Sequence, residues 1–119
     1  MCGLFGWIRN SAALTPEATR ILHQITRVLM AANEARGNDA TGYAFVARQG
    51  DRLAPVIVKE PTPARAFLHR QERELAAVCE SATPWLIGHT RQATVGPNDK
   101  ENAHPFLMGE TVGAHNGSV

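Results

Sequence analysis

The pattern of hydrophobic and polar positions predicts a series of short strands. The first apolar stretch, Gly3 to Ile8, predicts a buried strand, and the polar residues Asn10 and Ser11 predict a turn after it. Alternating runs from Thr41 to Arg48 and from Leu53 to Lys59 flank a turn-forming tetrapeptide and predict a β-hairpin. Two further β segments are expected later in the chain, a strand from Trp85 to His89 and a short hairpin from Phe106 to His115.

Two other segments have the spacing of apolar residues that is typical of helices. Thr15 is suited to be the N-cap of the first helix and Pro16 its first residue, and Gly37 is expected to end it in a left-handed conformation. A second helix is predicted from Ala64 to Ala82, and Cys79 is interpreted as part of its buried face rather than as a reactive thiol. The other residues predicted to face the core are Ile21, Leu22, Ile25, Val28, Leu29 and Ala32 in the first helix, and Phe67, Leu68, Leu75 and Val78 in the second.

The composition is that of a globular protein and disfavours several classes of function. A chain of 119 residues with a formal charge of +1 has room for one domain and no strongly charged surface. Its arginines are dispersed, so nucleic-acid binding is not expected. The short apolar N-terminus resembles neither a membrane span nor a secretion signal, so we expect a cytoplasmic protein without membrane association. Neither a metal site nor another cofactor is expected, because the histidines and cysteines lack the spacing of zinc ligands.

Cys2 is an unusual candidate nucleophile because only Met1 precedes it. Loss of Met1 would leave one residue with both a thiol and a free α-amine, and an α-amine titrates near neutrality and can accept the thiol proton. The alternative is a buried structural cysteine, since cysteine is among the most buried residue types. Position alone does not decide between the two. A disulfide between Cys2 and Cys79 is the less favoured pairing for a reducing compartment.

Four further segments are rich in polar residues that helices and strands rarely need. They lie at or near the ends of the predicted strands, where polar side chains can project into a cleft. Each residue taken singly has a structural explanation, such as a turn, an ion pair or a buried histidine. The segments are residues 36–42, 88–96, 102–106 and 114–117.

Together with the N-terminal Cys-Gly-x-x-Gly, these segments resemble the motifs of the class II glutamine amidotransferases, which are N-terminal-nucleophile hydrolases. The shared motifs are Arg-Gly-x-Asp-x-x-Gly, Gly-His-Thr-Arg-x-Ala-Thr, Asn-Ala-His-Pro and His-Asn-Gly. The third of the five motifs resembles the glucosamine-6-phosphate synthase and amidophosphoribosyltransferase branches. This motif departs from those branches at two positions, because the chain has Gln92 and Val95 where the family usually has Trp and often has His.

The resemblance implies a role for each motif residue. Cys2 would attack the side-chain amide of glutamine, and Asn116 and Gly117 would form the oxyanion hole. Arg91 and Thr94 would bind the substrate α-carboxylate. Three residues would support the site: Arg36, Asp39 and His104.

The resemblance also implies the fold. We expect an α+β protein of the N-terminal-nucleophile hydrolase type, an αββα sandwich of which this chain holds the N-terminal part, with a mostly antiparallel sheet and two helices. Residues 1–119 would be a glutamine amidotransferase type-2 domain truncated at its C-terminus, without the later acidic residue that normally binds the substrate α-ammonium. The expected partners are glutamine and an acceptor synthetase or transferase domain or subunit that uses the ammonia.

Two alternatives to glutamine hydrolysis stay open at this point. The chain could be a non-catalytic remnant that binds glutamine or a partner, or an amidase of the same chemical type that acts on a different amide. Arg91 argues against the second alternative, because such an amidase need not bind an α-carboxylate.

Overall fold

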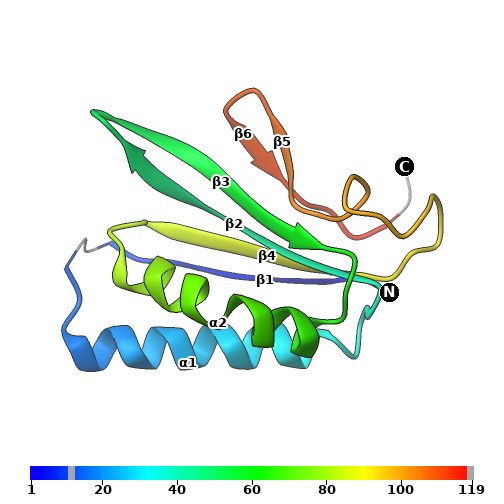
Figure 1. The fold of residues 1–119 in the computed structure, drawn as a ribbon, viewed down its shortest axis with the longest axis horizontal. Coiled ribbons are helices and arrows are strands. Elements are labelled where there is room, and N and C mark those ends of the chain that lie inside the picture. The colour runs from blue at the N-terminus through cyan, green and yellow to red at the C-terminus, as the bar shows by residue number, and fades with distance from the viewer. Residues whose placement is uncertain (11–12, 118–119) are drawn as a thin grey trace.

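A computed structural model describes residues 1–10 and 13–117 of the chain. A four-stranded antiparallel sheet in the order β1-β4-β2-β3 is covered on one face by both helices, and a small hairpin lies on the other side (Figure 1). The predicted α+β class, with its mostly antiparallel sheet and two helices, is confirmed. The elements are β1 (Gly3–Ile8), α1 (Pro16–Asn33), β2 (Ala40–Gln49), β3 (Arg52–Glu60), α2 (Ala64–Glu80), β4 (Trp85–Arg91), β5 (Phe106–Met108) and β6 (Thr111–Gly113).

The strands agree with the predicted segments to within a few residues, but β1 is not buried. The hairpin β2–β3 turns over Gly50, whose φ of 63° favours glycine, and β4 extends two residues beyond the predicted end at His89. Because the helices cover only one face of the sheet, alternate side chains of β1 point away from them, and Leu4 and Ile8 are 47% and 86% exposed. Of the predicted turn after β1, Ser11 lies outside the described residues.

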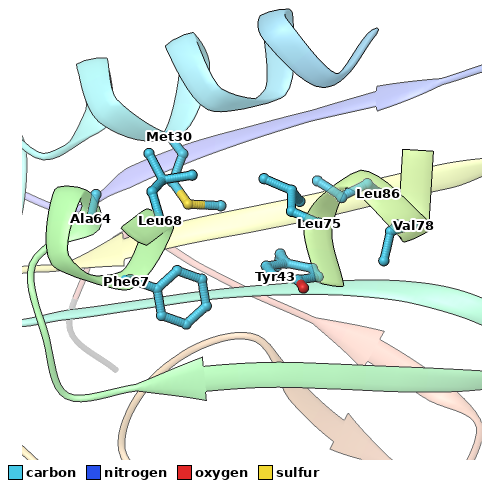
Figure 2. Close-up of a cluster of buried hydrophobic side chains, with 8 residues drawn as sticks. All are labelled: Met30, Tyr43, Ala64, Phe67, Leu68, Leu75, Val78 and Leu86. Carbon is cyan, nitrogen blue, oxygen red and sulfur yellow. The ribbon is translucent and has the colours of Figure 1, made fainter. Parts of the chain in front are cut away.

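The core lies between the helices and the sheet. Trp7 and Phe45 both lie opposite Leu86 and face the same side of the sheet. The ring of Tyr43 packs edge-on against Phe67, with ring centroids 5.9 Å apart. Burial of each large side chain contributes about 1.5–3 kcal/mol. The central cluster, shown in Figure 2, consists of Met30, Tyr43, Ala64, Phe67, Leu68, Leu75, Val78 and Leu86.

Helix α1 begins as predicted but does not end at Gly37. The Thr15 hydroxyl accepts a hydrogen bond from the Ala18 amide at 3.1 Å, as an N-cap does. The helix stops at Asn33, and Gly37 is not left-handed. Gly37 is required for space instead, because a Cβ there would lie 2.6 Å from the carbonyl carbon of Arg91. In the same way, α2 ends at Glu80, two residues before the predicted Ala82.

The predicted buried face of α1 is also wrong in part. Ile21, Ile25 and Val28 are 46%, 47% and 64% exposed, whereas Thr26 and Met30 are fully buried. Thr26 is tolerated in the core because its hydroxyl donates to the Leu22 carbonyl and accepts from the Trp7 indole at 3.0 Å. A buried face that is predicted only from the spacing of apolar residues does not include a buried threonine of this kind. The predicted burial of Cys79 in α2 is confirmed.

Arg9 fastens the end of β1 to the end of α2. Its guanidinium donates to the carbonyls of Thr83 at 2.7 Å and Cys79 at 3.3 Å, and also to that of Ser81. These carbonyls lie at and just beyond the C-terminus of α2, where a helix lacks its own donors. Arg9 therefore supplies the cap that no basic residue of the last turn provides. No helix within the described ranges combines the length and the apolar character needed to cross a membrane.

Candidate functional site

A cleft of about 410 Å³ is lined by residues from the N-terminus, from the end of β4 and from the segments around the β5–β6 hairpin. Its volume is within the range of pockets that bind small molecules. Five of the predicted site residues line it: Cys2, Arg91, Thr94, His104 and Gly117. The remaining three contact residues that line the cleft: Arg36 and Asn116 donate to the Cys2 carbonyl, and the Asp39 amide donates to the Arg91 carbonyl. The cleft thus brings together residues from both ends of the chain.

The half-buried Cys2 is held at both its thiol and its carbonyl. The Gln92 backbone N–H donates to Sγ at 3.3 Å, and Sγ lies 3.7 Å from the carbonyl oxygen of the same residue. The Cys2 carbonyl accepts from Arg36 Nε at 3.1 Å and from Asn116 Nδ2 at 2.9 Å. The surroundings of Cys2 are therefore those of a fixed and polar thiol, unlike those of the buried Cys79, and both cysteines are free.

The peptide bond to Met1 blocks the α-nitrogen of Cys2, but Met1 itself is accessible to solvent. Its side chain is 80% exposed, and its sulfur accepts a hydrogen bond from the Arg36 guanidinium at 3.0 Å. While Met1 is present, the Cys2 nitrogen belongs to a peptide bond and cannot act as a base.

The segment after α1 braces the loop that follows β4. Asp39 accepts a hydrogen bond from the Ala93 amide at 2.6 Å through its carboxylate, and its own amide donates to the Arg91 carbonyl at 2.9 Å. The close approach at Gly37 brings the two backbones into contact. Since Arg36 holds Cys2 from the same segment, one short stretch of chain positions the candidate nucleophile and the loop together.

Arg91 is 7% exposed and holds its own loop closed. Its two terminal nitrogens donate to the carbonyls of Pro97 at 2.8 Å and Val95 at 2.7 Å. A guanidinium has further N–H donors, which leaves capacity for a carboxylate in the cleft. Thr94, on the same loop, is exposed and lines the cleft.

Three histidines gather beside the cleft. The rings of His89 and His104 are stacked with centroids 4.2 Å apart, and the ring of His115 lies 4.8 Å from that of His104. Burial, together with smaller contributions from the neighbouring His89, His115, Arg91 and Lys59, lowers the pKa of His104 to about 4. Burial also lowers the pKa of His89, against the opposing effect of its hydrogen bond to the His115 carbonyl. His89 and His104 are therefore neutral at pH 7.

The chain then reaches Asn116 and Gly117 through a turn that requires glycine. Gly117 has a φ of 127°, a conformation that residues with a side chain rarely adopt. Its residue type is thus explained by the backbone, and the turn sets the direction of its N–H group.

Sequence reasoning did not assign roles to several residues that shape this site. Gln92 acts on Cys2 only through its backbone, so its side-chain type carries no signal. Lys59 occupies an ordinary position in β3 but donates to the carbonyls of Ala103 and Pro105 at 2.7 and 3.1 Å. His89 and His115 lie inside the recognised motifs, and a polar residue within a motif is the sequence feature that could have indicated a role for each of them. Nowhere in the described chain do three or more His, Cys, Asp or Glu side chains form a group that could hold a metal ion.

Comparison with characterised proteins gives one consistent relationship. The chain is 34% identical over 105 residues to the glutamine–fructose-6-phosphate aminotransferase of Gloeobacter violaceus, covering 88% of this chain and 14% of that enzyme. It is 33% identical to the Caulobacter vibrioides enzyme of the same name and 31% identical to that of Streptomyces coelicolor, covering all of this chain and 17% of each enzyme. The chain thus spans about a sixth of the length of these relatives. No model of a known protein family matches it, and no solved structure does either.

Proposed function

This chain is a homologue of the class II glutamine amidotransferase domain that glutamine–fructose-6-phosphate aminotransferases contain, and we propose that it hydrolyses glutamine with Cys2 as the nucleophile. The observation that carries the proposal is the shared cleft. The Cys2 thiol, the Arg91 guanidinium and the Gly117 turn lie around one small-molecule-sized space. In this proposal residues 1–119 are part of a glutamine amidotransferase type-2 domain.

The reaction begins after removal of Met1, which makes the Cys2 α-amine available. The amine takes the thiol proton, and the thiolate attacks the side-chain amide carbon of glutamine. As the tetrahedral intermediate collapses, the carbon–nitrogen bond breaks and the proton returns to the departing ammonia. Water then hydrolyses the glutamyl thioester and releases glutamate, and the thiol is restored.

Asn116 and Gly117 are proposed to stabilise the oxyanion of that intermediate. Asn116 reaches Cys2 already, since its Nδ2 donates to the Cys2 carbonyl at 2.9 Å. A modest rotation of this side chain would redirect the N–H toward an oxygen bound near Sγ. Loss of one such donor typically reduces kcat by about a hundredfold or more.

Arg91 and Thr94 are proposed to bind the substrate α-carboxylate. Arg91 is fixed by Val95 and Pro97 and keeps unused donors, so the carboxylate would meet a cation that is already oriented. Preorganisation of this kind lowers the entropic cost of binding. The ammonia is proposed to be used by an acceptor synthetase or transferase domain or subunit, as the much greater length of the relatives suggests.

The proposal is tested by measuring glutamate release from glutamine with the purified chain lacking Met1. Cys2→Ser should abolish release while leaving the fold intact, because serine keeps the size of the half-buried side chain. A sample that retains Met1 should also be inactive, since its nitrogen base is blocked. Equal turnover by the Cys2→Ser variant would refute the assignment of the nucleophile.

A non-catalytic module that binds glutamine is the alternative. It is favoured by the present hydrogen bond of Asn116, which donates to the Cys2 carbonyl rather than toward the cleft. Calorimetry separates the two functions: the binding module would bind glutamine without consuming it, whether or not Met1 is present.

A further inference from the structure

Histidine side chains hold both polar backbone groups of His115. The His115 N–H donates to Nδ1 of His104 at 3.3 Å, and its carbonyl oxygen lies 3.1 Å from Nε2 of His89. Because a carbonyl can only accept, Nε2 of His89 carries the hydrogen. Because the amide donates, Nδ1 of His104 has a free lone pair. The geometry therefore fixes one tautomer for each ring.

The two rings that grip His115 are rigidly supported. They are stacked at an interplanar angle of 16°, and the side chains of His89 and His104 belong to residues that are 0% and 8% exposed. His89 lies on the central strand β4. The backbone on either side of His104 is held by Lys59, whose Nζ donates to the carbonyls of Ala103 and Pro105. Both rings are thus fixed to the sheet, and His115 is fixed to the rings.

The charges around His104 favour the neutral ring that this arrangement needs. His89 and Arg91 face it from β4, Lys59 faces it from β3, and His115 faces it from the segment after β6. Each of these groups is a cation or becomes one on protonation, so each opposes a positive charge on His104. Protonation at Nδ1 would replace the acceptor for the His115 amide with a second donor.

We infer that His104 and His89 are positioning residues that fix the backbone of His115 and thereby present Asn116 and Gly117 to Cys2. The effect of this placement on catalysis rests on the proposed function. The clamp, by which we mean the two hydrogen bonds that join His104 and His89 to the backbone of His115, is a property of the chain itself. Asn116 and Gly117 follow His115 directly, and Asn116 already reaches Cys2. Misplacement of such donors by a fraction of an ångström lowers the rate of the chemical step more than it weakens binding.

Two substitutions of similar size test whether His104 acts through an acceptor at the position of Nδ1 or only through its polarity. The amide oxygen of His104→Asn can occupy the position of Nδ1, whereas that of His104→Gln lies near the position of Nε2. We expect His104→Asn to retain slow hydrogen exchange of the His115 amide, and His104→Gln to accelerate it by about tenfold or more. With the chain lacking Met1, His104→Gln should reduce kcat for glutamine hydrolysis by about tenfold and leave KM within about threefold, with rescue by His104→Asn.

The outcomes for the clamp and for the enzyme are distinct. Equal protection of the His115 amide in the wild type and in His104→Gln would overturn the clamp. Reduced protection with unchanged kcat would overturn its role in positioning the two donors. If the wild-type chain releases no glutamate, the proposed function fails while the exchange measurement still tests the clamp.

A measurement on the wild-type chain keeps the inference testable even where a variant fails to fold. Nitrogen-15 chemical shifts at neutral pH should show Nδ1 of His104 unprotonated and Nε2 of His89 protonated. The signal of the His115 amide should change as His104 gains a proton in acid. The opposite tautomer of His104, or a His115 amide that does not respond, would contradict the inference.

Discussion

Asp39 joins the segment between α1 and β2 to the loop after β4. Its carboxylate accepts a 2.6 Å hydrogen bond from Ala93, 54 positions along the chain. Asp39→Ala leaves that amide without its partner, so we expect a loss of about 1–3 kcal/mol in unfolding free energy. The loop should also hold Arg91 less well and raise KM for glutamine. Asp39→Asn keeps an acceptor and is the matched control in urea titrations and kinetics.

The backbone conformation at Gly117 strongly favours glycine over any other residue. Its φ of 127° means that Gly117→Ala forces the turn to change or to accept strain of about 1–3 kcal/mol. Because Gly117 is exposed at the rim of the cleft, we expect the turn to change its conformation rather than hold the strain, so that stability changes little and kcat for glutamine hydrolysis falls by about tenfold or more. Gly109→Ala, at a φ of 62° in the distant β5–β6 turn, is the control and should leave kcat unchanged.

At the scale of the elements, α1 is oriented by a partly buried hydrogen bond as well as by apolar contacts. Thr26→Val removes the acceptor of the Trp7 indole and should destabilise the chain by about 1–3 kcal/mol. Adding Trp7→Phe removes the unsatisfied donor, so the double variant should cost less than the sum of the two single variants. A double-mutant cycle of urea unfolding measures this coupling. Strict additivity would show that the hydrogen bond does not stabilise the helix.

The cap on α2 gives a second prediction for an element. Arg9→Ala should lower the unfolding free energy by about 1–2 kcal/mol, because the carbonyls of residues 79, 81 and 83 lose a partly buried charged donor. Arg9→Lys restores the charge but not the planar fork and should recover only part of the loss. Arg48→Ala, at the exposed tip of the β2–β3 hairpin, should cost almost nothing in the same titration.

Element type and order could be predicted from the sequence because the local signals were strong. Thr15 and Pro16 marked the start of α1, and alternation with a turn marked the hairpin β2–β3. What could not be predicted were features that depend on a partner distant in sequence. Gly37 resembles a helix stop locally, but its role is to allow contact with the loop after β4. The rotation of α1 likewise depends on Trp7, and the edge position of β1 depends on the order of the sheet.

For the site, the sequence supplied the candidate residues and the structure supplied their connections. Five of the eight predicted residues line one cleft, although they come from the N-terminus, from the end of β4, from the long connection between β4 and β5, and from the segment after β6. The motifs could not indicate that Gln92 acts through its backbone or that Lys59 holds the residues around His104. Both contacts depend on which segments the sheet brings together.

At the scale of the whole molecule, the neutral histidines make stability depend on pH. The folded-state pKa of His104 is about 4, below its ordinary value of about 6.5, so the unfolded chain binds the proton more readily. This contribution to stability is complete above about pH 6.5 and is lost as the pH falls toward 4. His104→Asn should therefore show a smaller decrease in urea midpoint between pH 7 and pH 4 than the wild type. An identical decrease in the two proteins would contradict the lowered pKa.

The most direct test of the account asks whether Cys2 lies in a glutamine site. The chain lacking Met1 would be incubated with a diazo-ketone analogue of glutamine and analysed by mass spectrometry. We predict stoichiometric labelling confined to Cys2, prevented by excess glutamine and strongly reduced by Arg91→Ala, with Cys79 unlabelled. Absence of labelling, in a sample whose Cys2 is alkylated by iodoacetamide and whose Met1 is confirmed absent, would contradict the proposal that this cleft binds glutamine beside a reactive thiol.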